Sequence, residues 1–84
     1  MFIVYILRSQ VTGKFYKGQT HDLAHRLAEH NAGKNKATAY GAPWVVVWSV
    51  EIESRSEAML LERKLKNITS MARLTRFLEK YGQG

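Results

Sequence analysis

Two short apolar segments near the N-terminus, each carrying one tyrosine, restrict the possible folds of this chain most. They occupy residues 2–7 and 15–19, and both are rich in β-branched or aromatic side chains, which favour strands. The polar stretch between them contains Thr12 and Gly13, which is typical of a turn. The two segments therefore predict a β-hairpin. Gly18, inside the second strand, indicates a bulge or a close approach of another group to the backbone.

A helix is predicted directly after the hairpin. Thr20 or Asp22 can cap its N-terminus, its apolar residues have helical spacing up to about Ala32, and Gly33 stands beyond its end. The stretch from residue 33 to residue 43 is polar and is predicted to be a surface loop.

The second half of the chain predicts one strand and two helices. Residues 44–50 are all tryptophan or valine except Ser49, which favours a strand, and successive strand side chains point to opposite faces. Ser54 with Glu57 resembles a capping box at the start of a helix, and Thr69 or Ser70 can cap a last helix. The order is strand, strand, helix, strand, helix, helix, which predicts an α+β fold in one domain over residues 1–84. On one face of the third strand we expect Trp44, Val46, Trp48 and Val50.

Charge and composition restrict the function. Thirteen Lys and Arg residues against seven Asp and Glu residues give a net charge of +6, which attracts polyanions such as nucleic acid. The alternative is a soluble basic protein whose positive charge does not serve to bind nucleic acid. The absence of cysteine excludes disulfides and thiolate metal sites and favours the cytoplasm. No apolar run approaches the ~20 residues of a membrane span, so no membrane association is expected.

One ordered series of residues resembles a known family. Ile3-Val4-Tyr5 and Tyr16-Lys17-Gly18 resemble the paired motif of the GIY-YIG nucleases. Ile3 stands where the first motif usually has glycine, but that glycine varies among members, so the difference does not exclude activity. Lys17 replaces the usual aliphatic residue of the second motif. The resemblance extends to about Asn67, and it continues through Gln19-Thr20, Leu23, Arg26, His30, Pro43-Trp44, Glu57-Ala58, Glu62 and Lys66.

The resemblance implies both a fold and an activity. The fold is a three-stranded antiparallel sheet flanked by helices, and the activity is metal-dependent DNA cleavage with Mg²⁺ or Mn²⁺. Tyr5 and Tyr16 match the two motif tyrosines, and Arg26 matches the catalytic arginine. Glu62 matches the metal ligand, and His30 matches a histidine that some members have beside the first tyrosine.

The same residues suit phosphodiester hydrolysis on chemical grounds. A tyrosine can activate water if nearby cations lower its pKa from about 10. Arg26 keeps its charge and can bind a phosphate through two N–H donors, while His30 can accept or relay a proton. Mg²⁺ prefers one or two carboxylates with waters and phosphate oxygens, so Glu62 alone would suffice.

Each candidate also has a structural explanation. Tyr5 and Tyr16 can be packing residues of strands, and Arg26 can be a solvated helix residue. His30 can simply flank the core. Glu62 and Lys66 are four residues apart and can form an ordinary surface ion pair.

Two hypotheses compete with nuclease activity. A catalytically degenerate module could bind nucleic acid or a repair protein without cleavage, or the domain could be structural with incidental charge. The sequence does not predict an oligomeric state. The candidate nucleic-acid-binding residues are Lys17, Lys34, Lys36, Arg73 and Arg76.

Overall fold

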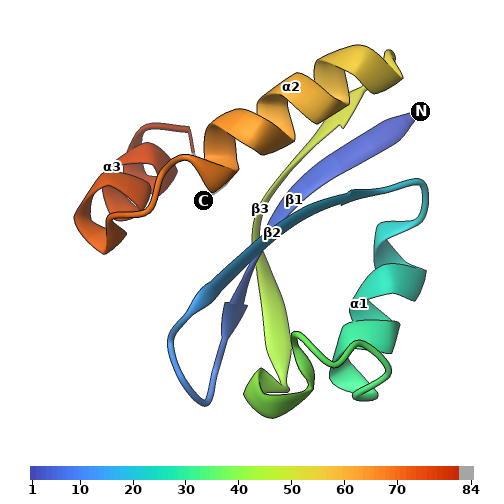
Figure 1. Cartoon of the computed structure of the whole chain (residues 1–84), viewed down its shortest axis with the longest axis vertical. Helices are drawn as coiled ribbons and strands as arrows, with labels where there is room; N and C mark the ends of the chain where they lie inside the picture. The colour runs from blue at the N-terminus through green and yellow to red at the C-terminus, as the bar shows by residue number, and fades with distance from the viewer. Residues whose placement is uncertain (82–84) are drawn as a thin grey trace.

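A three-stranded antiparallel sheet with helices on both faces forms the protein (Figure 1). The structure is a computed structural model that describes residues 1–81, the side chains of Met71 and Tyr81 excepted. The sheet order is β2-β1-β3, and the predicted α+β fold with the order ββαβαα is confirmed. The elements are β1 (Phe2–Ser9), β2 (Phe15–Thr20), α1 (Leu23–Asn31), the short 3₁₀ helix η1 (Ala39–Gly41), β3 (Trp44–Ile52), α2 (Arg55–Lys66) and α3 (Met71–Tyr81).

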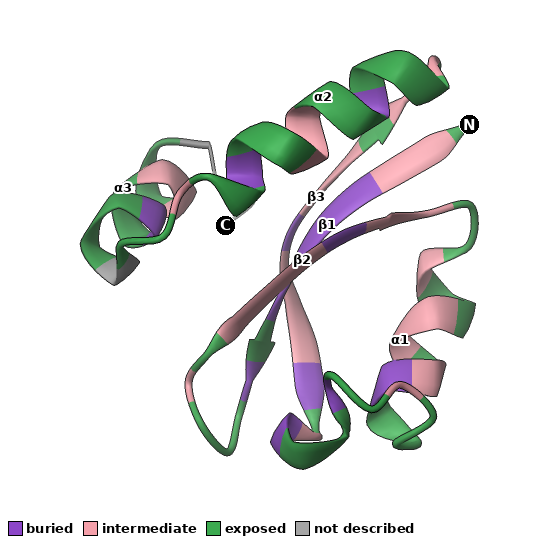
Figure 2. Cartoon of the chain, viewed as in Figure 1, coloured by how far each residue is buried: buried purple, intermediate pink, exposed green. Residues whose placement is uncertain are grey.

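The central strand β1 separates two apolar clusters, because its successive side chains point to opposite faces of the sheet. Val4 and Ile6 point to the α2 face, whereas Tyr5 and Leu7 point to the α1 face. Figure 2 shows buried positions along β1 and on α1 and α2, where the buried residues are His30 in α1 and Ala58 and Leu65 in α2. The larger cluster, on the α2 face, consists of Val4, Ile6, Trp48, Ala58, Leu65 and Leu74. The smaller cluster, on the α1 face, consists of Tyr5, Leu7 and Trp44, with Tyr16, Leu23 and Leu27 packed against it.

A β-bulge in β3 changes the predicted distribution of its side chains. Ile6 is paired with Trp48 but the next residue of β1, Leu7, is paired with Val46, so Val47 is an extra residue. One extra residue reverses the alternation that follows it. The prediction of a shared face is therefore wrong: Trp44 and Val46 lie in the α1-face cluster, and Trp48 and Val50 lie in the α2-face cluster. Both tryptophans are core residues, as their alternation with valines indicated.

The helix ends form as the sequence predicts. The Asp22 side chain accepts a hydrogen bond from the His25 backbone N–H at 3.1 Å, which selects Asp22 rather than Thr20 as the cap of α1. Gly33 has a φ of 76°, which favours glycine beyond the helix end. Ser54 caps α2 by accepting from the Glu57 N–H at 3.4 Å. Within residues 1–81, no helix is long and apolar enough to cross a bilayer.

The connection between α1 and β3 is mostly exposed, as the sequence predicts, but hydrogen bonds hold part of it against the rest of the protein. Thr38 and Gly41 are buried within it. The Trp44 indole N–H donates to the Thr38 carbonyl at 2.7 Å, and the Ser9 hydroxyl donates to the Gly41 carbonyl at 2.6 Å. The Asn31 side chain accepts a hydrogen bond from the Trp44 backbone N–H at 2.6 Å and donates one to the Trp44 carbonyl at 3.2 Å. These bonds place Thr38 beside the C-terminal end of α1.

Candidate active site

Tyr5 lies in the middle of the sheet on the α1 face, and its side chain is 1% exposed. Its partner across the β1–β2 pair is Gly18. A Cβ atom at position 18 would lie 2.8 Å from the Tyr5 hydroxyl oxygen and 3.0 Å from Cζ, which is closer than side-chain atoms pack. Gly18 thus allows the phenol ring to lie across β2, and the predicted close approach to the backbone is confirmed.

A series of hydrogen bonds starts at the Tyr5 hydroxyl. The hydroxyl lies 3.2 Å from His30 Nε2, and His30 Nδ1 lies 2.7 Å from Thr38 Oγ1. The Thr38 hydroxyl donates to the Asn35 carbonyl at 3.4 Å, so its oxygen accepts from His30 Nδ1–H. The Nε2 atom of neutral His30 then carries a lone pair, and the Tyr5 O–H donates to it. This arrangement gives the Tyr5 proton an acceptor inside the protein.

His30 is neutral around physiological pH. Burial lowers the pKa of its imidazole below 6.5, because a buried charge loses its hydration, and the positive charge of Arg26 lowers it further. Glu29 opposes both effects but is the weakest of the three. A neutral imidazole is the form that can accept a proton from Tyr5.

Burial also determines the protonation of Tyr5. It raises the pKa of the phenol above its ordinary value, and the nearby Tyr16 and Glu62 add to the rise. The Arg26 guanidinium donates a hydrogen bond to the phenol and opposes the shift, but burial is the largest effect. The sequence hypothesis required nearby cations to lower this pKa, and here the loss of hydration outweighs them. Tyr5 is therefore a neutral phenol that donates to His30.

Tyr16 lies next to Tyr5 on the same face of the sheet. Its ring centroid is 4.9 Å from that of His30 and 6.4 Å from those of Tyr5 and Trp44. These contacts fix the His30 ring from the side and exclude water from one side of the Tyr5–His30 bond.

Arg26 connects the Tyr5 hydroxyl with the surface. Its side chain is 35% exposed, and Nη1 lies 3.5 Å from a carboxylate oxygen of Glu29. A polar cavity of about 270 Å³ opens beside it, lined by Arg26 and Glu29 together with Lys34, Asn35 and Lys36. Two of the predicted phosphate-binding lysines thus lie in the same cavity as Arg26.

Glu62 on α2 is the candidate metal ligand. Its negative charge adds to the raised pKa of the Tyr5 phenol, as the smallest of the contributions after burial and the charge of Tyr16. Its side chain is 19% exposed, and its carboxylate forms an ion pair with Lys66 Nζ at 3.0 Å. Within the described chain, no group of three or more His, Cys, Asp or Glu side chains could hold a metal ion. One partly exposed carboxylate nevertheless fits Mg²⁺, which accepts waters and phosphate oxygens as its other ligands.

Three predicted nucleic-acid-binding residues lie away from this cluster. Lys17 points to the α2 face, where its amine donates to the Ile68 carbonyl at 2.7 Å and burial lowers its pKa. Its position therefore favours a structural contact between β2 and the connection that follows α2. Arg73 and Arg76 are exposed on α3, and a role in phosphate binding remains a prediction for both.

The sequence contained no sign of two residues that organise the site. Thr38, which fixes the His30 tautomer, stands in a polar stretch that predicts only a loop. Asn31, which binds the Trp44 backbone, stands in the last turn of α1 and resembles any exposed helix residue. Only the position of the α1–β3 connection gives them partners.

Comparison with known proteins agrees with this geometry. The chain matches the family model of the GIY-YIG catalytic domain over residues 1–74. UPF0213 proteins of Yersinia pestis (strain Pestoides F) and Yersinia pseudotuberculosis serotype O:3 (strain YPIII) are each 39% identical over 67 residues, which cover 79% of this chain and 70% of each relative. The solution NMR structure of a UPF0213 protein from Bacillus halodurans is 31% identical with a TM-score of 0.63, covering 98% of this chain and 87% of that one.

The matched range includes the sheet, α1 and α2, and therefore every side chain of the cluster around Tyr5. The similar solved structure extends over nearly the whole chain. The hairpin tyrosines, the arginine and histidine of α1 and the glutamate of α2 occur in the order that the sequence resemblance implied. The chain belongs to the GIY-YIG catalytic domain family.

Proposed function

We propose that the protein is a metal-dependent endonuclease that hydrolyses phosphodiester bonds, with DNA as the expected substrate. The observation that carries the proposal is the hydrogen-bonded series from Tyr5 through His30 to Thr38, with Arg26 on the same phenol. It combines a group that can take a proton from water, an acceptor behind it and a permanent positive charge. The nuclease family to which the chain belongs supports the same reaction class.

Tyr5 would activate water without first becoming a free phenolate. As the water oxygen attacks phosphorus, its proton moves to the Tyr5 oxygen and the phenolic proton moves to His30 Nε2. The bond from phosphorus to the leaving oxygen breaks in the same displacement, the leaving oxygen takes up a proton from solvent, and His30 returns its extra proton to solvent afterwards. Because the Tyr5 pKa is raised, this transfer through His30 is more favourable than prior ionisation of the phenol.

Arg26 would bind the phosphate at which this displacement occurs. Its guanidinium has five N–H donors, of which the contacts with Tyr5 and Glu29 use only some. Its permanent charge offsets the negative charge that develops on the phosphate oxygens. Lys34 and Lys36, on the same cavity, extend the positive surface along the strand that enters the site.

A divalent cation would be held by Glu62. When bound, Mg²⁺ or Mn²⁺ supplies positive charge to the phosphate oxygens and helps to orient the substrate. Lys66 would have to leave the carboxylate of Glu62, and its own side chain is 58% exposed, so water can replace the ion pair at little cost.

A second candidate function is binding of nucleic acid without cleavage. The observation that favours it is the ion pair of Glu62 with Lys66, which occupies the carboxylate that the metal needs. In that case the Tyr5 hydrogen bonds would serve only the stability of the sheet.

A cleavage screen distinguishes the two functions. Wild-type protein is incubated with Mg²⁺, Mn²⁺ or EDTA and a panel of duplex, branched and single-stranded DNA, with RNA for comparison. Glu62→Ala should abolish metal-dependent cleavage while the far-UV CD spectrum and the melting temperature stay close to those of wild type. Glu79→Ala, which removes an exposed carboxylate of α3, is the matched control and should cleave normally. Cleavage by Glu62→Ala at limiting metal would leave Glu62 as a surface partner of Lys66.

A further inference from the structure

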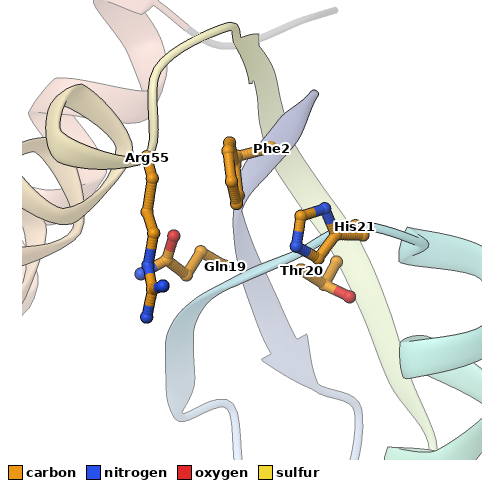
Figure 3. Close-up of a pocket in the computed structure, with 5 residues that line it drawn as sticks. All are labelled: Phe2, Gln19, Thr20, His21 and Arg55. Atoms are coloured by element: carbon orange, nitrogen blue, oxygen red, sulfur yellow. The ribbon is translucent and has the colours of Figure 1, made fainter.

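A second cavity lies where the end of β2 approaches the start of α2, away from the Tyr5 cluster. Its volume is about 290 Å³, and it is lined by Phe2, Gln19, Thr20, His21 and Arg55 (Figure 3). None of these residues takes part in the hydrogen-bonded series from Tyr5 to Thr38. The cavity therefore requires an explanation of its own.

Two side chains in this cavity have N–H donors to offer. In Figure 3 the Arg55 side chain extends along the cavity, which the Gln19 side chain also lines. Within residues 1–81, no ion pair or side-chain hydrogen bond engages either group. A guanidinium and an amide that line one cavity both offer N–H donors, which suit the oxygens of a phosphate group.

The opposite wall of the cavity is apolar. The Phe2 ring stands between Arg55 and His21 in Figure 3, and its centroid is 4.4 Å from that of His21. His21 contacts one side of the Phe2 ring, and the other side of the ring faces Arg55. A nucleotide combines a charged phosphate with less polar sugar and base surfaces, and this cavity combines a charged wall with an aromatic one.

The position of the cavity relates it to the proposed metal ligand. Arg55 and Glu62 are seven residues apart on α2, close to two helical turns, so they lie on one stripe about 10 Å apart. Gln19 is paired with Val4 in the sheet, so its side chain lies on the α2 face, the side of the sheet on which Glu62 is carried. A duplex rises by about 3.4 Å per nucleotide, so a phosphate at Arg55 would lie within a few nucleotides of a metal held by Glu62.

We propose that this cavity binds the phosphate of a nucleotide that flanks the cleaved bond. Arg55 and Gln19 donate to the phosphate oxygens, and Phe2 contacts the sugar. This inference rests on the proposed function, because the strand held by Arg55 is the strand that is delivered to Tyr5. Its effect is on affinity and on the position of cleavage, and not on the chemical step.

Binding measured without metal tests the cavity separately from cleavage. The affinity of a fluorescein-labelled DNA duplex for wild type, Arg55→Ala, Gln19→Ala and Arg63→Ala is measured by anisotropy in EDTA over a range of salt concentrations. Arg63→Ala removes the same charge from an exposed position of the same helix and is the matched control. Thermal melting confirms that each variant is folded.

Arg55→Ala should bind about tenfold more weakly at low salt, the size expected for one charged hydrogen bond. Its log–log salt slope should be about 0.9 smaller in magnitude than that of wild type, the loss of one phosphate contact. Gln19→Ala should bind more weakly with an unchanged slope, and Arg63→Ala should resemble wild type. Equal effects of Arg55→Ala and Arg63→Ala, no effect of Arg55→Ala, or no binding by wild type would each overturn the proposal. Wild type that binds through Arg55 but never cleaves with metal would refute the nuclease proposal alone.

Discussion

The Tyr5 hydroxyl has a different partner for each of its two hydrogen-bonding roles. It donates to His30 Nε2 and accepts from the Arg26 guanidinium, so it is oriented by both its proton and its lone pair. Burial keeps the phenol protonated, and the same burial keeps His30 neutral. Two predictions at the scale of single residues follow from this pair.

Tyr5→Phe removes one oxygen atom and leaves the packed ring. We expect the cleavage rate to fall by about 10²–10⁴-fold, the usual contribution of a general base. The free energy of unfolding should fall by about 1–3 kcal/mol, because the buried His30 nitrogen loses its donor. Single-turnover cleavage and thermal melting measure the two effects. Tyr16→Phe is the comparison and should lose less activity, and a wild-type rate for Tyr5→Phe would disprove the catalytic assignment.

The lowered pKa of His30 predicts a pH dependence with a definite sign. The unfolded chain protonates His30 near 6.5 and the folded protein only at lower pH, so folding favours the neutral form. Its contribution to stability is complete above 6.5 and is lost as the pH falls through the lower folded pKa. The acid limb of the cleavage rate should likewise have its midpoint below 6.5, since protonated His30 cannot accept the Tyr5 proton. NMR titration of the His30 ring measures the pKa, and a midpoint at or above 6.5 would contradict the relay.

At the scale of secondary-structure elements, the β1–β2 pair positions both tyrosines of the site. Register places Gly18 opposite Tyr5 and Tyr16 opposite Leu7, which brings both tyrosines to the α1 face. The hairpin leads directly into α1. The Asp22 cap determines the residue at which this helix begins, and therefore the face on which Arg26 and His30 lie.

Gly18→Ala tests whether this strand pairing determines the geometry of Tyr5. The added methyl group would lie 2.8 Å from the Tyr5 oxygen, so the Tyr5 ring or the β2 backbone must shift, which disturbs the contact of Tyr5 with His30. We expect a loss of about 1–3 kcal/mol in unfolding free energy and a large loss of cleavage.

Gly13→Ala is the control for the strand-pairing test. Its φ of 76° disfavours alanine, but the nearest atom to the new methyl group is 4.0 Å away and belongs to Arg8. It should lower stability without affecting cleavage at a temperature where it is folded. If both variants lose activity in proportion to stability, the contact of Gly18 with Tyr5 has no special role. Urea unfolding and cleavage rates provide the two measurements.

At the scale of the whole molecule, positive charge is spread over more than one surface. The cavity at Arg26 carries Lys34 and Lys36, while Arg73 and Arg76 are exposed on α3 beyond the other face of the sheet. The net charge of +6 should draw nucleic acid to the protein whichever surface binds it.

Nucleic-acid binding should therefore weaken steeply as salt increases. Each phosphate that is neutralised on duplex DNA adds about 0.9 to the negative slope of log affinity against log salt. We expect a slope that corresponds to several phosphates, measured by anisotropy in EDTA. Charge reversal at Arg73 and Arg76 should reduce this slope if α3 contacts the substrate. An affinity that does not change with salt would remove the main physical argument for a nucleic-acid partner.

Most of the fold could be predicted because its elements are determined by neighbouring residues. The hairpin follows from two strand-forming segments with a turn between them, and the helix starts follow from Asp22 and Ser54. The bulge at Val47 could not be predicted, because it reflects how β3 pairs with β1 and leaves no local pattern. Its consequence is large, since it assigns Trp44 and Trp48 to opposite faces.

The sequence by itself determined which side chains are candidates for the chemistry, because their types and order are a property of the chain alone. Tertiary structure alone decided how those side chains behave. It buried Tyr5 and raised its pKa, placed Thr38 where it sets the His30 tautomer, and directed Lys17 to a backbone carbonyl on the other face. Hydration and hydrogen-bond partners depend on groups that are distant in sequence, so no local pattern contains them.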